Sequence, residues 1–206
     1  MQSKLTPEII KKMSKQEWQV LYDDDYMRYE RLMPDFQTRL KHIPYRFKWF
    51  ARYIPERSRV LDVGCGDGLL CAYLASLGHK CLGIDCSQKA IEVCRENVPN
   101  ADFLHLFVED MDFKEEFDAV CCSEVIEHLK DPKLAVKKMW KATKHVLLIT
   151  TPIGYALNCP LHLNHFGLYE IVDLFEGLTD NFMICRIPKA VEGGTKNLFA
   201  IRAYKR

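Results

Sequence analysis

Several motifs that would assign this chain to a common class are missing from its 206 residues. None of the nine cysteines forms a C-x-x-C pair, which excludes a zinc knuckle and a thioredoxin-type redox motif. The Gly-Lys-Ser/Thr sequence of a phosphate-binding P-loop is also missing. No run of about 20 apolar residues is present to span a membrane, and no apolar signal core follows Met1. These absences predict a cytoplasmic protein with buried, reduced thiols and no membrane span.

The charge balance is near zero overall but uneven along the chain. Residues 1–58 hold 12 basic and 8 acidic side chains, residues 59–185 hold 11 and 19, and residues 186–206 hold 6 and 1. Nucleic-acid phosphates are bound by concentrated positive charge, so the acidic centre disfavours a nucleic-acid partner. Hydrophobic residues make up 48% of the chain, which is typical of a globular protein with a substantial core.

The first third of the chain has helical patterns. Thr6 followed by Pro7 is typical of a helix start, and apolar residues then recur at helical spacing through Leu21. A second helix is predicted from Asp35 to about Tyr53, with its apolar residues facing inward. The sequence therefore predicts two helices before the first strand.

From Arg59 onward the pattern changes to an alternation of strands and helices. Apolar runs of about five residues between turn residues are typical of buried parallel strands. Their alternation with helices predicts an α/β fold with a doubly wound, mostly parallel seven-stranded sheet. Two runs around Glu192-Gly193-Gly194 predict a closing antiparallel hairpin. The predicted strands are 59–63, 80–84, 102–107, 117–122, 145–150, 182–187 and 198–204, and the predicted helices between them are 67–77, 87–97 and 131–142.

A glycine-rich turn follows the first predicted strand. Gly64, Gly66 and Gly68 have no Cβ, so the backbone can turn tightly there and approach a ligand closely. Such a turn alone fits several nucleotide-type ligands. The dinucleotide fingerprint requires a further glycine at position 69, where this sequence has Leu69. Leu69 therefore opposes a nicotinamide-dependent oxidoreductase.

Acidic residues near this turn narrow the choice of ligand. Asp85 ends the second predicted strand, 21 positions after Gly64, where a carboxylate can accept hydrogen bonds from both ribose hydroxyls. Asp62 places a negative charge beside the turn, which repels a pyrophosphate and suits a cationic ligand. After the third strand comes Glu109-Asp110-Met111, where a carboxylate can bind an adenine amino group while Met111 packs on the ring.

Together these motifs resemble the class I S-adenosylmethionine-dependent methyltransferases over roughly residues 59–205. The resemblance rests on Leu61 to Gly68, Gly83-Ile84-Asp85, Glu109-Asp110-Met111 and the segment from Phe117 to His128. It implies a Rossmann-like fold in which residues 59–206 form the S-adenosylmethionine-binding catalytic domain and residues 1–58 form a helical cap over the pocket. One departure is that Lys141-Ala142-Thr143-Lys144-His145 stands where the family has a Lys-Pro-Gly-Gly turn.

The resemblance also implies roles for individual residues. Gly64, Cys65 and Gly66 would line the methionine part of the cofactor, with Ser123 on the same side. Asp85 would bind the ribose, and Asp110 with Met111 the adenine. The full predicted cofactor-binding set is Asp62, Gly64, Cys65, Gly66, Asp85, Cys86, Glu109, Asp110, Met111 and Ser123.

Glu124-Val125-Ile126-Glu127-His128 follows the fourth predicted strand. On a helix, its spacings of three and four would put both carboxylates and the imidazole on one face. Such a set suits Mg²⁺, Mn²⁺ or Zn²⁺. The string looks like a signature of ubiquinone-biosynthesis O-methyltransferases and of small-RNA terminal ribose methyltransferases, where a metal holds the substrate hydroxyls. His162 and His165, downstream of the fifth strand, are candidate further ligands.

Three interpretations of this string stay open at this point. The first is a metal site made by Glu124, Glu127 and His128, with His162 or His165 as a further ligand. The second is a metal-free active site, in which Glu124 lies near the cofactor and His128 acts as general base or only lines the pocket. The predicted catalytic residues are His128 and Glu127. The third is a helix start with a purely structural role.

The sequence predicts a methyltransferase that acts on a hydroxyl of a small molecule. The alternatives are an RNA terminal ribose methyltransferase and a non-catalytic S-adenosylmethionine-binding subunit, and N-methylation also stays open. The sequence predicts neither the acceptor nor the oligomeric state.

Overall fold

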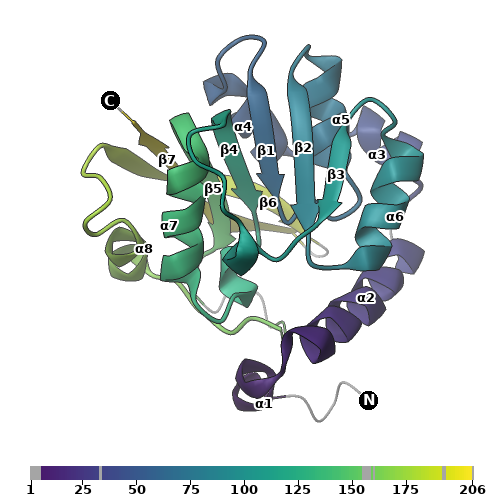
Figure 1. Ribbon diagram of the computed structural model, residues 1–206, viewed down its shortest axis with the longest axis horizontal. Helices are drawn as coiled ribbons and strands as arrows, with labels where there is room; N and C mark the ends of the chain where they lie inside the picture. The colour runs from purple at the N-terminus through teal and green to yellow at the C-terminus, as the bar shows by residue number, and fades with distance from the viewer. Residues whose placement is uncertain (1–5, 33, 155–158, 160, 192–193, 206) are drawn as a thin grey trace.

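Seven strands form one sheet at the centre of the computed structural model (Figure 1). The strands are β1 Arg59–Val63, β2 Lys80–Asp85, β3 Asp102–His105, β4 Phe117–Ser123, β5 Thr143–Pro152, β6 Phe182–Val191 and β7 Gly194–Tyr204. They are arranged in the order β3-β2-β1-β4-β5-β7-β6. Strands β1 to β5 run parallel, whereas β7 is antiparallel to both β5 and β6. This order confirms the predicted α/β sheet with a closing antiparallel hairpin.

Helices cover both faces of this sheet and the carboxyl ends of its parallel strands. The structure describes residues 6–32, 34–154, 159, 161–191 and 194–205, with the backbone alone for 26–32, 190–191 and 194–195. Glu192 and Gly193 of the predicted hairpin turn therefore lie outside the described residues. The helices are α1 Pro7–Lys12, α2 Lys15–Leu32, α3 Phe36–Lys41, α4 Tyr45–Tyr53, α5 Leu69–Ser76, α6 Gln88–Asn97, α7 Pro132–Ala142 and α8 Leu168–Leu174, together with the short 3-10 turns η2 Val108–Asp110 and η3 Ile126–His128.

Each predicted N-terminal helix is in fact two helices. Ser14 begins α2, because its backbone N–H and its hydroxyl both donate to the Glu17 carboxylate, at 2.7 and 2.8 Å. This reciprocal Ser-x-x-Glu arrangement caps a new helix. The second break lies between α3 and α4, where Pro44 has no N–H to donate and disfavours helical geometry at the residue before it.

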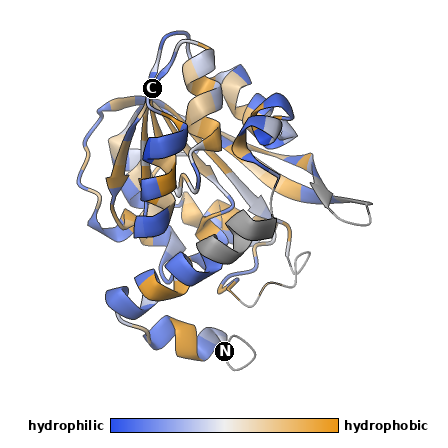
Figure 2. Ribbon diagram, turned by 90° about the vertical axis from the view of Figure 1, so that its right-hand side faces the viewer, coloured by the Kyte–Doolittle hydropathy of each residue, from blue (hydrophilic) through white to orange (hydrophobic). Residues whose placement is uncertain are grey.

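The core is divided by the sheet into two apolar clusters. Along β1, Val60 packs on the face covered by α3 to α6, whereas Leu61 packs on the face covered by α7 and α8. This alternation is the period of two expected of a strand that is buried on both sides. Figure 2 shows hydrophobic residues concentrated in the strands and hydrophilic residues frequent in the surrounding helices. Phe47 and Phe50 of α4 belong to the same cluster as Val60, so α4 is part of the core.

The two N-terminal helices occupy a different place. In Figure 1, α1 and α2 lie beneath the carboxyl ends of the parallel strands. Ile10 and Trp18 pack there against Leu161 and Leu163 in a third, smaller cluster. No helix among the described residues is both long enough and apolar enough to cross a membrane.

The nine cysteines are all free thiols, and six of them are buried as predicted. Cys86 and Cys159 are half-buried, and Cys185 on β6 is exposed, contrary to the prediction. The turn before β5 also differs from the family pattern. Helix α7 ends at Ala142 and β5 begins at Thr143, whose hydroxyl donates to the Met139 carbonyl at 2.8 Å.

Candidate active site

A cavity of about 290 Å³ lies at the carboxyl ends of β1, β2 and β4. Strand β1 has β2 on one side and β4 on the other, so the strand order reverses direction at β1. Open α/β sheets bind ligands at the carboxyl ends of the strands where the order reverses. Helix α2 closes one side of the cavity with Trp18, Tyr22 and Asp25. A second cavity of about 180 Å³ adjoins the first across the glycine turn and shares Gly64, Gly66 and Ser123 with it.

The glycine turn between β1 and α5 has the left-handed backbone that only glycine adopts without strain. Gly64 and Gly66 have φ values of +72° and +55°. A Cβ on Gly64 would lie 2.3 Å from a methyl carbon of Val125, whereas a Cβ on Gly66 would have no neighbour within 4 Å. The Gly64 and Cys65 N–H groups donate to the Ile84 carbonyl at 2.8 and 3.0 Å. The turn is thus fixed against β2, and Gly66 faces open space.

Asp85 lies at the end of β2 and lines the larger cavity. Its carboxylate accepts hydrogen bonds from the Gly66 N–H at 3.0 Å and the Ser87 N–H at 2.8 Å. Burial raises the pKa of Asp85, while these two hydrogen bonds act in the opposite direction. Ser87, not Asp85, caps helix α6. Asp85 therefore ties the glycine turn to the start of α6 while its carboxylate still borders the cavity.

Asp62 lies beneath the glycine turn and lines the smaller cavity. The residue is only 2% exposed, and its carboxylate accepts a weak hydrogen bond from the Cys71 thiol at 3.5 Å. Burial raises the pKa of Asp62 to about 7. A cationic group in this cavity would stabilise the ionised carboxylate.

The residues after β3 differ most from the sequence-based expectation. Strand β3 ends at His105, two residues earlier than predicted, and η2 follows. Asp110 turns outward into an ion pair with Lys15 at 2.5 Å, and Met111 is 1% exposed within the core. Neither of these two predicted adenine-binding residues lines the described cavity. Leu106, Phe107, Val108 and Glu109 line it instead.

Two arginines that the sequence analysis did not select border the smaller cavity. Arg46 of α4 donates from Nε to the Ser123 hydroxyl at 3.1 Å and lies 3.0 Å from a Glu124 oxygen. Arg39 of α3 pairs with Asp67 in the glycine turn. The only sequence signal for them was the basic balance of residues 1–58. They place positive charge beside Ser123 at the end of β4.

Glu124 shares no helix with Glu127 and His128, so the helical spacing that would place all three on one face does not apply. Its φ is +57°, a strained value for a residue with a side chain, and its N–H donates to the Thr150 carbonyl at 2.7 Å. The 3-10 turn η3 begins only at Ile126. The Glu124 carboxylate forms ion pairs with Arg46 and with Lys189 of β6.

Glu127 is a buried carboxylate with an unpaired oxygen. The residue is 2% exposed, and Oε2 accepts a hydrogen bond from the Thr151 hydroxyl at 3.0 Å. Oε1 is buried without a hydrogen-bond partner in the described structure. Burial raises the pKa of Glu127 to about 8, and the nearby Glu124 charge adds to this effect. A buried polar atom left without a partner is costly, so Oε1 is an atom that a bound ligand could satisfy.

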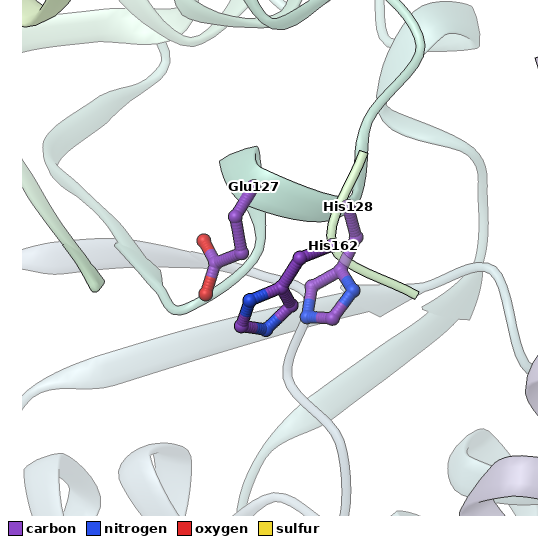
Figure 3. A group of neighbouring side chains, drawn as sticks. All are labelled: Glu127, His128 and His162. Carbon is purple, nitrogen blue, oxygen red and sulfur yellow. The ribbon is translucent and has the colours of Figure 1, made fainter. Parts of the chain in front are cut away.

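His128 borders the larger cavity, and burial lowers its pKa, so the ring is neutral at pH 7. His162 packs beside it with ring centroids 4.8 Å apart, and burial lowers the pKa of His162 to about 4. Figure 3 shows the Glu127 carboxylate and the His162 ring turned toward each other, with the His128 ring beside them. One ligand atom from each of the three residues lies within 4.8 Å of the others.

The structure thus brings together three of the five predicted metal ligands. Glu124 stands apart in its ion pairs, and the His165 ring centroid lies 6.4 Å from that of His162. Of the predicted cofactor-binding residues, those that line one of the two cavities are Asp62, Gly64, Cys65, Gly66, Asp85, Cys86, Glu109 and Ser123.

Part of the chain is similar to known methyltransferases. A family profile described as a methyltransferase domain matches residues 61–146. The ubiquinone biosynthesis O-methyltransferase of Albidiferax ferrireducens is 35% identical over 102 residues, covering 46% of this chain and 40% of that protein. The protein of the same name from Xanthomonas axonopodis pv. citri is 36% identical over 119 residues, covering 52% and 50%. The chain therefore matches half or less of the length of these curated relatives.

Solved structures share the fold over most of the chain. Magnesium protoporphyrin IX methyltransferase from Synechocystis PCC 6803 has a TM-score of 0.69 at 16% identity, covering 91% of this chain and 98% of that one. The 1,6-didemethyltoxoflavin-N1-methyltransferase of Burkholderia thailandensis has a TM-score of 0.70 at 14% identity, covering 94% and 91%. Residues 61–146 thus match a methyltransferase domain, and the fold of the whole chain is one that solved methyltransferases share.

Proposed function

We propose that this chain transfers the methyl group of S-adenosylmethionine to a hydroxyl oxygen of a small molecule. The observation that supports this most is the cavity itself, which runs from Asp85 past the glycine turn to the neutral ring of His128. A cofactor bound along the turn would place its reactive end near an imidazole that can accept a proton. Bound S-adenosylmethionine supplies an electrophilic methyl group, so the protein has mainly to orient the acceptor and remove its proton.

The cofactor fits the residues of the two cavities. Asp85 has carboxylate capacity left to accept the ribose hydroxyls. Phe107, Val108 and Glu109 surround the position proposed for the adenine, in place of Asp110 and Met111. The smaller cavity offers Asp62 for the cationic end, and Arg46 for the carboxylate of the methionine part.

His128 is the proposed general base. Its Nδ1 lies 3.0 Å from the Leu161 carbonyl oxygen, which only accepts hydrogen bonds, so Nδ1 carries the hydrogen. In the neutral ring the lone pair is then on Nε2, and this atom can take the proton of an attacking hydroxyl. The lowered pKa of His128 keeps this lone pair available at pH 7.

A divalent cation also fits Glu127, His128 and His162. The orphaned Oε1 atom of Glu127 and two neutral imidazoles make one carboxylate and two nitrogen ligands. This donor set suits Zn²⁺ or Mn²⁺ better than Mg²⁺, which prefers oxygen ligands. A bound cation would act as a Lewis acid that lowers the pKa of the acceptor hydroxyl. In that case Glu127, His128 and His162 would hold the cation, and His128 would be a ligand rather than the general base.

We further propose that the helices before residue 59 cover the pocket, chiefly through α2. Trp18 and Tyr22 line the cavity, and the Tyr22 ring packs edge-on against His128 with centroids 6.0 Å apart. Such aromatic side chains exclude water from the reacting atoms. They also favour a planar organic acceptor over a bulky polymer.

The test is transfer of a labelled methyl group from S-adenosylmethionine to a panel of phenols and catechols, with amines and an RNA 3′ end as separate arms. Transfer to a phenolic oxygen supports the proposal, and the names of the curated relatives make it the first arm to measure. Transfer to amines alone, or to RNA alone, would replace the small-molecule hydroxyl as the proposed acceptor. Cofactor binding without transfer to any arm would contradict the catalytic part of the proposal.

A further inference from the structure

The ammonium group of Lys189 forms an ion pair with Glu124. It lies on β6, in the antiparallel part of the sheet, and forms its ion pair with Oε2 of Glu124. The Lys189 side chain is 22% exposed and that of Glu124 only 14%. The pair is therefore largely shielded from water, where an ion pair is stronger than at the surface.

The second Glu124 oxygen is also occupied. Oε1 lies 3.0 Å from Nε of Arg46, which in turn donates to the Ser123 hydroxyl. The Glu124 backbone is fixed by the hydrogen bond from its N–H to Thr150 and by its positive φ. Two cations and one fixed backbone thus hold this carboxylate in one place, although carboxylates are good ligands for divalent metals.

Glu124 nevertheless belongs to the same neighbourhood as the proposed metal ligands. It lines the larger cavity together with His128. The charges of Glu124 and Lys189 both act on Glu127, His128 and His162, with opposite effects on the pKa of each. The Lys189 ammonium group is therefore close enough to repel a divalent cation bound between these three side chains.

We propose that Lys189 is a specificity-determining residue, which holds Glu124 out of the ligand set and limits the Glu127–His128–His162 group to three protein ligands. This inference rests on the metal-assisted form of the proposed function. With Lys189 in place, the group offers one carboxylate and two imidazoles and favours Zn²⁺. Without the ammonium group, Oε2 of Glu124 becomes free to add a second carboxylate, and the local positive charge falls by one.

Two measurable consequences follow from the release of Glu124. A divalent cation should bind more tightly, because one more anionic ligand is available and one repelling charge is removed. Mn²⁺ should gain more than Zn²⁺, because oxygen ligands favour the harder ion. The gain should require Glu124, since Lys189 acts mainly through that carboxylate.

The experiment is calorimetric titration of chelator-treated protein with Zn²⁺ and with Mn²⁺. The variants are Lys189→Met, Lys189→Arg as the charge-preserving control, and the double variant Lys189→Met/Glu124→Gln. Titration of each protein with S-adenosylhomocysteine checks that the fold and the cofactor site are intact.

We expect Lys189→Met to bind Mn²⁺ at least 10-fold more tightly than the unmodified protein, and Lys189→Arg to bind within about 3-fold of it. The double variant should lose the gain. Unchanged metal affinity in Lys189→Met, no metal binding by either protein, or a gain that persists in the double variant would each overturn the inference. If one of these results is found while S-adenosylhomocysteine still binds, the methyltransferase proposal stands. If the unmodified protein does not bind S-adenosylhomocysteine at all, the proposed function itself is contradicted.

Discussion

Nδ1 of His128 donates a hydrogen bond to the main-chain oxygen of Leu161 across 3.0 Å. The loop that carries Leu161 is held in place by the N–H groups of Leu163 and Asn164, which donate to the Glu127 carbonyl at 2.8 and 2.9 Å. The loop after β5 therefore fixes the orientation of a ring that belongs to η3. Because Nδ1 is occupied, Nε2 is the atom left for chemistry.

Replacing His128 with alanine should lower methyl transfer by about 10²- to 10⁴-fold, the range typical for loss of a general base. Affinity for S-adenosylhomocysteine should stay within about 2-fold, because Asp85 and the glycine turn, not this ring, are proposed to hold the cofactor. The measurement is steady-state turnover alongside calorimetric binding. His145→Ala is the matched control, since His145 is 62% exposed at the start of β5. Equal turnover in the two variants would remove His128 from the mechanism.

Gly64→Ala should destabilise the fold more than Gly78→Ala. Both glycines have positive φ, which costs an alanine about 1–2 kcal/mol. A Cβ on Gly64 also meets Val125 at 2.3 Å, whereas one on Gly78 meets nothing within 4 Å. We expect an additional loss of about 1–3 kcal/mol at Gly64 from this overpacking. Urea unfolding of both variants measures the difference, and equal midpoints would show that the turn is looser than described.

The buried carboxyl of Asp62 should make stability fall as the pH rises. Its folded pKa of about 7 lies above the ordinary value near 4, so between these values the folded protein binds more protons than the unfolded chain. The contribution is complete below pH 4 and is lost on the way to pH 7. The unfolding free energy of the unmodified protein relative to Asp62→Asn should thus drop by about 1 kcal/mol per pH unit between pH 5 and 7. Parallel curves for the two proteins would contradict the raised pKa.

Metal removal tests the group of Glu127, His128 and His162. Treatment with a chelator should lower turnover at least 10-fold, and addition of Zn²⁺ or Mn²⁺ should restore it. Glu127→Gln should weaken metal binding by at least 10-fold, because it removes the one carboxylate of the group. Turnover that is indifferent to the chelator would leave His128 as a general base without a metal.

The sheet and its glycine turn could be predicted because their signals are local. Buried strands such as Arg59–Val63 are short apolar runs between turn residues. The glycines from Gly64 to Gly68 have positive φ, a left-handed conformation that residues with a side chain rarely adopt. The broken N-terminal helices were also signalled locally. Ser14 and Glu17 form a capping box, and Pro44 disfavours helical geometry at the residue before it. Both signals lie inside stretches whose apolar periodicity favours one continuous helix.

The arrangement of the candidate site could be predicted only in part, because it depends on distant contacts. The partners of Glu124 are Arg46 of α4 and Lys189 of β6, and no spacing in the sequence brings these residues together. The family resemblance implies that Asp110 binds the adenine, and the sequence pattern predicts that β3 runs to residue 107. Since β3 ends at His105, the following turn faces Glu109 inward and Asp110 toward Lys15.

The most direct test of the whole account is calorimetric binding of S-adenosylhomocysteine to the purified protein, with NAD as the comparison ligand. We predict saturable binding of one S-adenosylhomocysteine per chain and none of NAD. Asp85→Ala should weaken this binding by about 10- to 100-fold, the value of hydrogen bonds to a charged group, whereas Asp110→Ala should leave it unchanged. Absence of S-adenosylhomocysteine binding, or binding that Asp110→Ala weakens and Asp85→Ala does not, would contradict the cofactor site described here.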